Sequence, residues 1–129
     1  MNEMEDYLIN RNRNINRGFR KLEVWKEAID LFVFVKKKLG TISGVSFKVK
    51  AQIEDSSFSV HSSIAEGYGR RYLKESIQMN SIALASMAEN YSQIYALLKA
   101  KIVDQAGLTN MMRYTILWRI SLLITISLR

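Results

Sequence analysis

The sequence predicts an all-α fold of four helices, and three observations support this prediction. The 129-residue chain has no proline and only six glycines, so it has few of the turn-forming residues that connect the strands of all-β proteins. Apolar residues recur at three-, four- and seven-residue spacings, as on the buried face of a helix. The length and the 48% hydrophobic content fit one globular domain.

Residues 1–18 are predicted to form a flexible N-terminal arm, ahead of a bundle at 19–129. The first eight residues hold three acids, and residues 10–18 largely alternate asparagine with arginine. Neither stretch has an apolar period, which is typical of a solvated segment without a packed face.

The first helix is expected at about 20–39 and the second at about 48–66, with a loop at 41–45 between them. The apolar stripe of the first consists of Leu22, Trp25, Ile29, Phe32 and Leu39, widened by Ala28, Leu31 and Val35. Three lysines and Gly40 close it, as expected at a helix C-terminus. The second helix presents Val49, Ile53, Ser57, Val60 and Ile64 on one face. Its many serines are poor helix formers but allow a neighbouring helix to approach closely, and Gly67-Tyr68-Gly69 is expected to end it.

The third helix is predicted at about 73–100 and the fourth at about 104–127, with Asp104 as the N-cap of the fourth. The expected seam of the third consists of Ile77, Leu84, Met87, Ala88, Tyr91, Ile94, Tyr95 and Leu98. Residues 120–128 partly alternate apolar and polar residues, which is also a strand signal, but no second strand is available for pairing. As a helix this segment is apolar nearly all round, which indicates a subunit interface. It is too short for a membrane span, and Arg119 interrupts it.

Composition excludes several kinds of site. The chain has no cysteine and one histidine, so a zinc-thiolate site, a disulfide and a His-rich metal site are ruled out, and we expect no cofactor and no metal. The first thirty residues lack a signal-peptide core, so we expect a cytoplasmic protein. His61 stands among serines, but neighbours along a helix point in different directions and do not form a nucleophile–base pair. We considered a carboxylate pair of Glu66 and Glu89, but favour a structural role in which Glu66 pairs with Arg70 or Arg71. No catalytic residue is assigned, and we expect that the protein is not an enzyme.

Several short blocks occur in a defined order along the chain. They are the segments 19–28 and 52–67, followed by Gly69-Arg70-Arg71, Ile82-Ala83 and Ser86-Met87-Ala88-Glu89. In this order and spacing they resemble the 23S rRNA intervening-sequence proteins. The segment 19–28 is similar to the opening of that family, and 52–67 aligns without a gap with its second block, roughly Q-L-R-R-A-A-x-S-I-x-x-N-I-A-E-G. The other three blocks match later landmarks, so the resemblance covers about 19–103. The motif positions are Trp25, Gln52, Ser59, Ile64, Ala65, Glu66, Gly67, Gly69, Arg70, Ser86 and Glu89.

This resemblance implies an up-down-up-down four-helix bundle that assembles as a homopentamer. A related branch, the accessory variability proteins of diversity-generating retroelements, binds reverse transcriptase and is basic enough to bind nucleic acid. This chain departs from the family pattern in helix 48–66, where Glu54 and Asp55 replace two residues that are often basic, Ser63 replaces an asparagine and His61 replaces a common proline. The two acids weaken the expectation that this helix contacts phosphates.

Charge is the main functional signal. The formal net charge is +7, and it becomes +10 when the three acids of the first ten residues are set aside. In an up-down bundle the basic clusters fall at both ends. The candidate nucleic-acid-binding residues are Arg11, Arg13, Arg17, Arg20, Lys36, Lys37, Lys38, Lys48, Lys50, Arg70, Arg71 and Lys74. Lysine-rich helix ends are also ordinary solvated caps, and Tyr68 and Tyr72 can either stack on bases or pack at the turn.

We therefore expect a non-catalytic homo-oligomer that binds nucleic acid or a nucleic-acid enzyme through basic helix ends. The expected partners are further copies of the chain, RNA or DNA, or a reverse transcriptase-like protein, and no membrane. The alternative is a protein–protein adaptor or assembly module without a nucleic-acid role.

Overall fold

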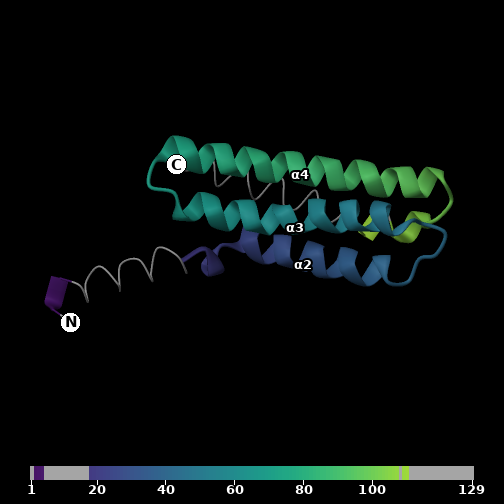
Figure 1. The fold of residues 1–129 in the computed structure, drawn as a ribbon, viewed down its shortest axis with the longest axis horizontal. Coiled ribbons are helices and arrows are strands. Elements are labelled where there is room, and N and C mark those ends of the chain that lie inside the picture. The colour runs from purple at the N-terminus through teal and green to yellow at the C-terminus, as the bar shows by residue number, and fades with distance from the viewer. Residues whose placement is uncertain (1, 5–17, 108, 111–129) are drawn as a thin grey trace.

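The computed structural model describes residues 2–4, 18–107, 109 and 110. These residues form η1, a 3-10 helix over Gly18–Lys21, followed by the α-helices α2 (Glu23–Leu39), α3 (Phe47–Gly69) and α4 (Leu73–Lys99). No strand occurs within this described part, so the all-α prediction is confirmed there. The loops at 40–46 and 70–72 turn the chain back on itself, and the three α-helices lie alongside one another (Figure 1).

Two predictions fall largely outside the described residues. These are the arm, of which 5–17 are not described, and the helix at 104–127 with its strand alternative at 120–128. The start of that helix can be examined. The carboxylate of Asp104 accepts a hydrogen bond from the backbone N–H of Gly107 at 2.8 Å, which confirms the predicted N-cap.

The first helix of the prediction is divided in two by Leu22, whose backbone is extended between η1 and α2. The N–H of Leu22 donates to the carbonyl of Phe19 at 2.9 Å, and the Phe19 ring packs edge-on against Trp25 at 5.1 Å. The buried line of α2 differs from the predicted stripe because Leu22, Trp25, Ile29 and Phe32 are only half-buried, whereas Val24 is buried. That line consists of Val24, Ala28, Leu31, Val35 and Leu39.

Helix α3 begins at Phe47 because the Ser46 hydroxyl accepts a hydrogen bond from the N–H of Val49 at 3.2 Å. Helix α3 continues three residues beyond the predicted end near residue 66 and ends at Gly69, the last residue of the Gly67-Tyr68-Gly69 segment that is expected to end it. Gly67 is buried against α4, where a methyl group on its Cα would lie 2.9 Å from Cβ of Met79. This glycine therefore permits a close approach of two helices and does not serve as a helix stop.

The buried face of helix α4 matches its predicted seam only in part. Met87 and Ile94 are buried as predicted, and Leu84, Tyr91 and Leu98 pack against the core. Ala88 is exposed, however, and Ile77 and Tyr95 are 37% and 42% exposed. The buried line is instead Ser76, Asn80, Ala83, Met87, Asn90, Ile94 and Leu97. Small and amide side chains lie along this side of α4 because α3 presents hydroxyl groups to it: Ser56 bonds to Asn90 and Gln93, and Ser59 contacts Ser86.

A polar network joins α3 to α4. The Asn90 amide is 2% exposed and donates to the carbonyl of Ile53 and to the hydroxyl of Ser56, both at 3.1 Å. The Ser56 hydroxyl also lies 2.7 Å from Oε1 of Gln93. Each bond has a defined partner across the interface, so the network fixes how far along each other the two helices are placed.

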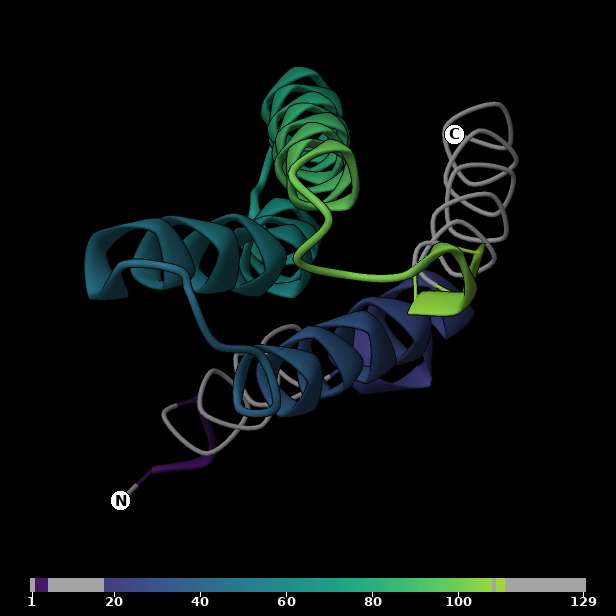
Figure 2. The same ribbon diagram turned by 90° about the vertical axis from the view of Figure 1, so that its right-hand side faces the viewer.

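Helix α4 ends in a Schellman turn at Lys101, whose φ of 61° lies in the left-handed region. The N–H of Ile102 donates to the carbonyl of Leu97 and that of Lys101 to Leu98, both at 2.9 Å. The chain then crosses from α4 toward the end of α2, where Gly107 lies against the Lys38 side chain (Figure 2). None of the helices within the described ranges is both long and apolar enough to cross a membrane.

Candidate nucleic-acid interface

Three helix ends bring lysines to one end of the molecule, which we call the lysine pole. The C-termini of α2 and α4 and the N-terminus of α3 all lie at this end (Figure 1). The residues of the lysine pole are Lys36, Lys37, Lys38, Lys48, Lys50, Lys99 and Lys101. The carboxylates near them are Glu54, Asp55 and Asp104, so positive charge is in excess. Lys99 and Lys101 are absent from our sequence-based candidates, although the predicted up-down arrangement also places the end of the third helix at this pole.

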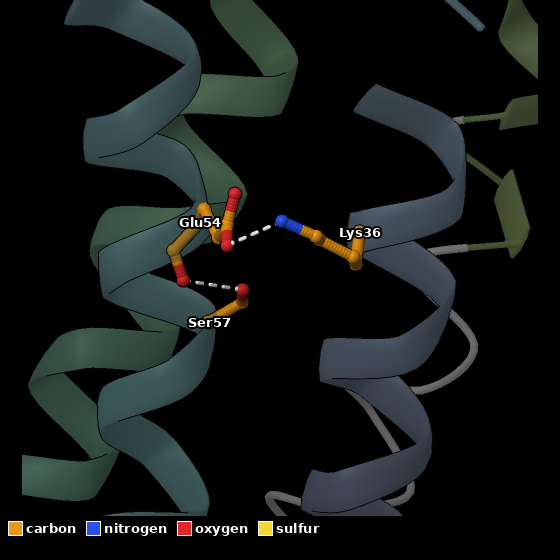
Figure 3. A network of polar contacts seen from close by, with 3 residues as sticks. All are labelled: Lys36, Glu54 and Ser57. Atoms are coloured by element: carbon orange, nitrogen blue, oxygen red, sulfur yellow. Dashed lines mark hydrogen bonds and ion pairs between the residues drawn. The ribbon is translucent and has the colours of Figure 1, made fainter. Parts of the chain in front are cut away.

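Two lysines of the pole have structural partners. The ammonium of Lys36 donates to Glu54 at 2.7 Å across α2 and α3, and the backbone carbonyl of Glu54 accepts the hydroxyl of the buried Ser57 at 2.8 Å (Figure 3). The ammonium of Lys50 donates to the carbonyl of Ile42 at 2.9 Å and so holds the loop between these helices. Their charges are partly committed within the fold.

The remaining lysines face solvent to different degrees. Lys37, Lys48 and Lys101 are exposed and make no ion pair within the described residues, while Lys38 is half-buried. The ammonium of Lys99 lies 5.6 Å from the centroid of the Tyr95 ring. The exposed ammonium groups are therefore free to contact an anion, such as a phosphate of a nucleic-acid backbone.

The opposite pole, formed by η1, the end of α3 and the start of α4, has a more balanced charge. Arg70 pairs with Glu66, and the guanidinium of Arg71 lies 5.5 Å from the centroid of Tyr72. Arg20 and Lys74 are exposed, and Glu23 and Glu75 are nearby in the chain. Among the described residues the opposite pole has five cations (Arg20, Lys21, Arg70, Arg71 and Lys74) and three carboxylates (Glu23, Glu66 and Glu75), whereas the lysine pole has seven cations and three carboxylates. Arg11, Arg13 and Arg17 lie outside the described residues.

The two tyrosines of this opposite pole have separate environments. Tyr68 is half-buried, and Gly18 of η1 packs directly against its ring. Tyr72 is 60% exposed under the Arg71 guanidinium. Packing at the turn thus accounts for Tyr68, whereas Tyr72 remains open to solvent.

The family-motif residues have mainly structural roles. Ile64 is buried in the core, Trp25 packs on Phe19, Gly67 contacts α4, and the half-buried Ala65 lies next to Glu66, which pairs with Arg70. The hydroxyls of Ser59 and Ser86 lie 2.9 Å apart and join α3 to α4. Gly69 is the last residue of α3.

Four motif residues line one polar groove of about 360 Å³ between α3 and α4. These four are Gln52, Ser59, Ser86 and Glu89, and the other lining residues are Asp55 and Ser56. Glu89 also accepts a hydrogen bond from Gln93 at 3.4 Å. Asn90 and Gln93 complete this interface and are missing from our sequence-based candidates. The one feature of the sequence that could have identified these two amides is their position on the apolar face of the helix, because a buried amide needs a hydrogen-bond partner.

Glu66 and Glu89 do not form a pair. Glu89 lies at the level of Ser59, whereas Glu66 neighbours Gly67, which contacts Met79, ten residues before Glu89 on α4. Ten residues span about 15 Å of helix. Across the described residues, no three carboxylate or imidazole groups come close enough to hold a metal ion.

His61 lies in an aromatic cluster between α2 and α3. Its ring centroid is 4.6 Å from that of Phe58 and 5.9 Å from that of Phe32. Nε2 is buried and has no hydrogen-bond partner within the described part of the chain. Burial lowers the pKa of His61 because desolvation disfavours the imidazolium. This environment agrees with the expected position at the edge of the core.

Packed helices with cations concentrated at one end define a small, basic helical-bundle protein. More particularly, the chain belongs to the family of 23S rRNA-intervening sequence proteins, whose model matches residues 20–117, about three quarters of the chain. This match confirms the resemblance found in the sequence. No curated protein shows a significant match to the chain.

Proposed function

We propose that this protein is a non-catalytic, homo-oligomeric bundle that binds nucleic acid through its lysine pole. The observation that supports the proposal is the convergence of seven lysines from three helix ends, with three carboxylates nearby. Contacts between lysine and phosphate give affinity without sequence information, so we expect binding that depends strongly on salt and weakly on sequence.

The test compares two variants that each lose three positive charges. The pole variant carries Lys37→Ala, Lys48→Ala and Lys101→Ala, the three lysines that are exposed and make no ion pair within the described residues. The control variant carries Arg20→Ala, Arg71→Ala and Lys74→Ala at the opposite pole. Binding of a fluorescent single-stranded RNA is measured by anisotropy between 50 and 200 mM salt.

We expect the pole variant to lower the slope of log K against log salt by about 2, since each phosphate contact on a single strand contributes about 0.7. The control variant should retain a slope close to that of the unmodified protein. An equal decrease of the slope in both variants would show that binding depends on net charge alone and not on the lysine pole. Absence of binding by the unmodified protein at 50 mM salt would refute the proposal.

The adaptor alternative makes a different prediction for native extracts. Under our proposal, nuclease treatment releases the material that co-purifies with the protein. One stable protein partner that survives nuclease and high salt would support the adaptor instead.

Self-association is part of the proposal. It is supported by large apolar side chains that are about two-fifths or more exposed on each described α-helix: Val33, Phe58 and Ile82. Exposed apolar surface favours association between protein molecules. The family resemblance implies five copies, and light scattering that shows a stable monomer would refute this part.

A further inference from the structure

Phe47 is an unusual residue for the lysine pole. It is the first residue of α3, and its side chain is 87% exposed, the largest exposed fraction among the large apolar residues described. The Ser46 cap fixes the start of the helix and therefore the backbone position from which the Phe47 side chain projects. Single exposed apolar side chains are common, and the surroundings of this one must decide its significance.

The Phe47 ring lines an open pocket of about 450 Å³. Leu39, Gly40 and Ala51 provide apolar or small surface in this pocket, and Lys36 and Lys50 line it as well. A flat aromatic ring beside apolar surface, with cations around it, has the composition of sites on which nucleobases stack while their phosphates meet lysines.

The charges that line the pocket balance, since Lys36 and Lys50 are matched by Glu54 and Asp55. Lys36 is paired with Glu54, and the positive charge available for a phosphate is that of the exposed Lys48, which follows Phe47 directly in the chain. Asp55 also lines the pocket and makes no ion pair within the described residues. Its carboxylate repels a nearby phosphate, so a substitution of Asp55 provides a second, independent test of the inference.

We propose that Phe47 stacks on an unpaired base of a single-stranded nucleic acid whose phosphates contact Lys48 and Lys37. A base in a duplex is already stacked and paired, so a duplex can reach the lysines but cannot place a base on the ring. This inference rests on the proposed function, and it narrows the ligand to single-stranded RNA or DNA.

The experiment measures binding of a single-stranded RNA and of a duplex of the same length. Phe47→Ala should weaken single-strand binding by about 5- to 150-fold, the range expected for loss of one base–aromatic stack. Duplex binding and the salt slope should stay unchanged, because no phosphate contact is lost. Phe47→Trp should retain single-strand affinity.

Two further variants act as controls. Leu73→Ala removes another exposed apolar side chain, at the start of α4 on the opposite pole, and should leave binding unchanged. Asp55→Asn should tighten binding of both ligands, because it removes a carboxylate near the phosphates. Circular dichroism and light scattering check that each variant keeps the helical content and the oligomeric state of the unmodified protein.

The outcomes separate the two levels of the proposal. Equal loss of single-strand and duplex binding in Phe47→Ala, or no loss of either, would overturn the stacking inference while the lysine pole could still bind phosphates. A change in oligomeric state in Phe47→Ala would also overturn it and make the ring a contact between copies. If the unmodified protein binds neither ligand, the proposed function itself fails.

Discussion

Replacing Gly67 with alanine tests the close approach of α3 and α4. The new Cβ would lie 2.9 Å from Cβ of Met79 and 3.2 Å from the carbonyl oxygen of Ser76. Ordinary contacts begin near 3.4 Å, so α4 must move away by about 0.5 Å. The backbone carbonyl cannot rotate aside as the end of a flexible side chain can, and the strain therefore falls on the packing of the two helices.

The expected cost follows from two opposing terms. Overpacking in a well-packed interface costs about 1–3 kcal/mol, and the rigid backbone neighbour places this case in the upper half of that range. Alanine in place of glycine inside a helix returns about 1 kcal/mol. We therefore expect Gly67→Ala to lower the free energy of unfolding by about 1–2 kcal/mol.

Urea denaturation followed by circular dichroism at a fixed protein concentration measures this difference. A loss of that size should move the midpoint down by about 0.5–1 M urea. Gly40→Ala is the matched control, because the nearest atom to its new Cβ is the Lys37 carbonyl at 3.4 Å and its φ of −69° suits any residue. A Gly67→Ala protein as stable as the Gly40→Ala protein would refute the reasoning about close approach.

Two further predictions concern buried polar groups. Asn90→Ala removes both hydrogen bonds to α3 and should destabilise the protein by about 2–3 kcal/mol in the same urea assay. The control Ser92→Ala, at an exposed position, should change the stability by less than about 0.5 kcal/mol. Equal effects of the two substitutions would show that the network is energetically unimportant. Burial lowers the pKa of His61 below its ordinary 6.5, so the unfolded chain binds the proton more readily than the folded protein does. The stability contributed by the neutral ring is therefore present above pH 6.5 and is lost as the pH falls below it. Solvent screening keeps the effect below about 1 kcal/mol. His61→Gln should remove this difference between pH 7.5 and 5.5 in thermal unfolding, and an unchanged pH dependence would contradict the assignment to His61.

Local chemistry made much of the fold predictable. The absence of proline and the apolar periods place three helices where the structure has them, and Asp104 and Gly40 mark a start and a stop through hydrogen bonds between near neighbours. The order and spacing of the motif blocks likewise identify the family, since such a pattern is a property of the chain itself.

The rotation of α4 was not predictable in the same way. An apolar seam predicts which face avoids water, but the partner decides which face is buried. The serines of α3 select Asn90 and the small residues beside it, and leave Ile77 and Tyr95 partly exposed. The role of Gly67 was not predictable for a similar reason. The sequence does not distinguish a glycine that ends a helix from one that allows a neighbouring helix to approach closely.

The sequence by itself determined the helical class, the family and the excess of positive charge. Only the tertiary structure decided where that charge is free to act. It commits Lys36 to Glu54 and Lys50 to a loop carbonyl, leaves Lys101 exposed at the same pole, and places Phe47 beside them. The physical reason is that charge and periodicity are sums over nearby residues, whereas pairing and exposure depend on which distant segments the packed helices bring together.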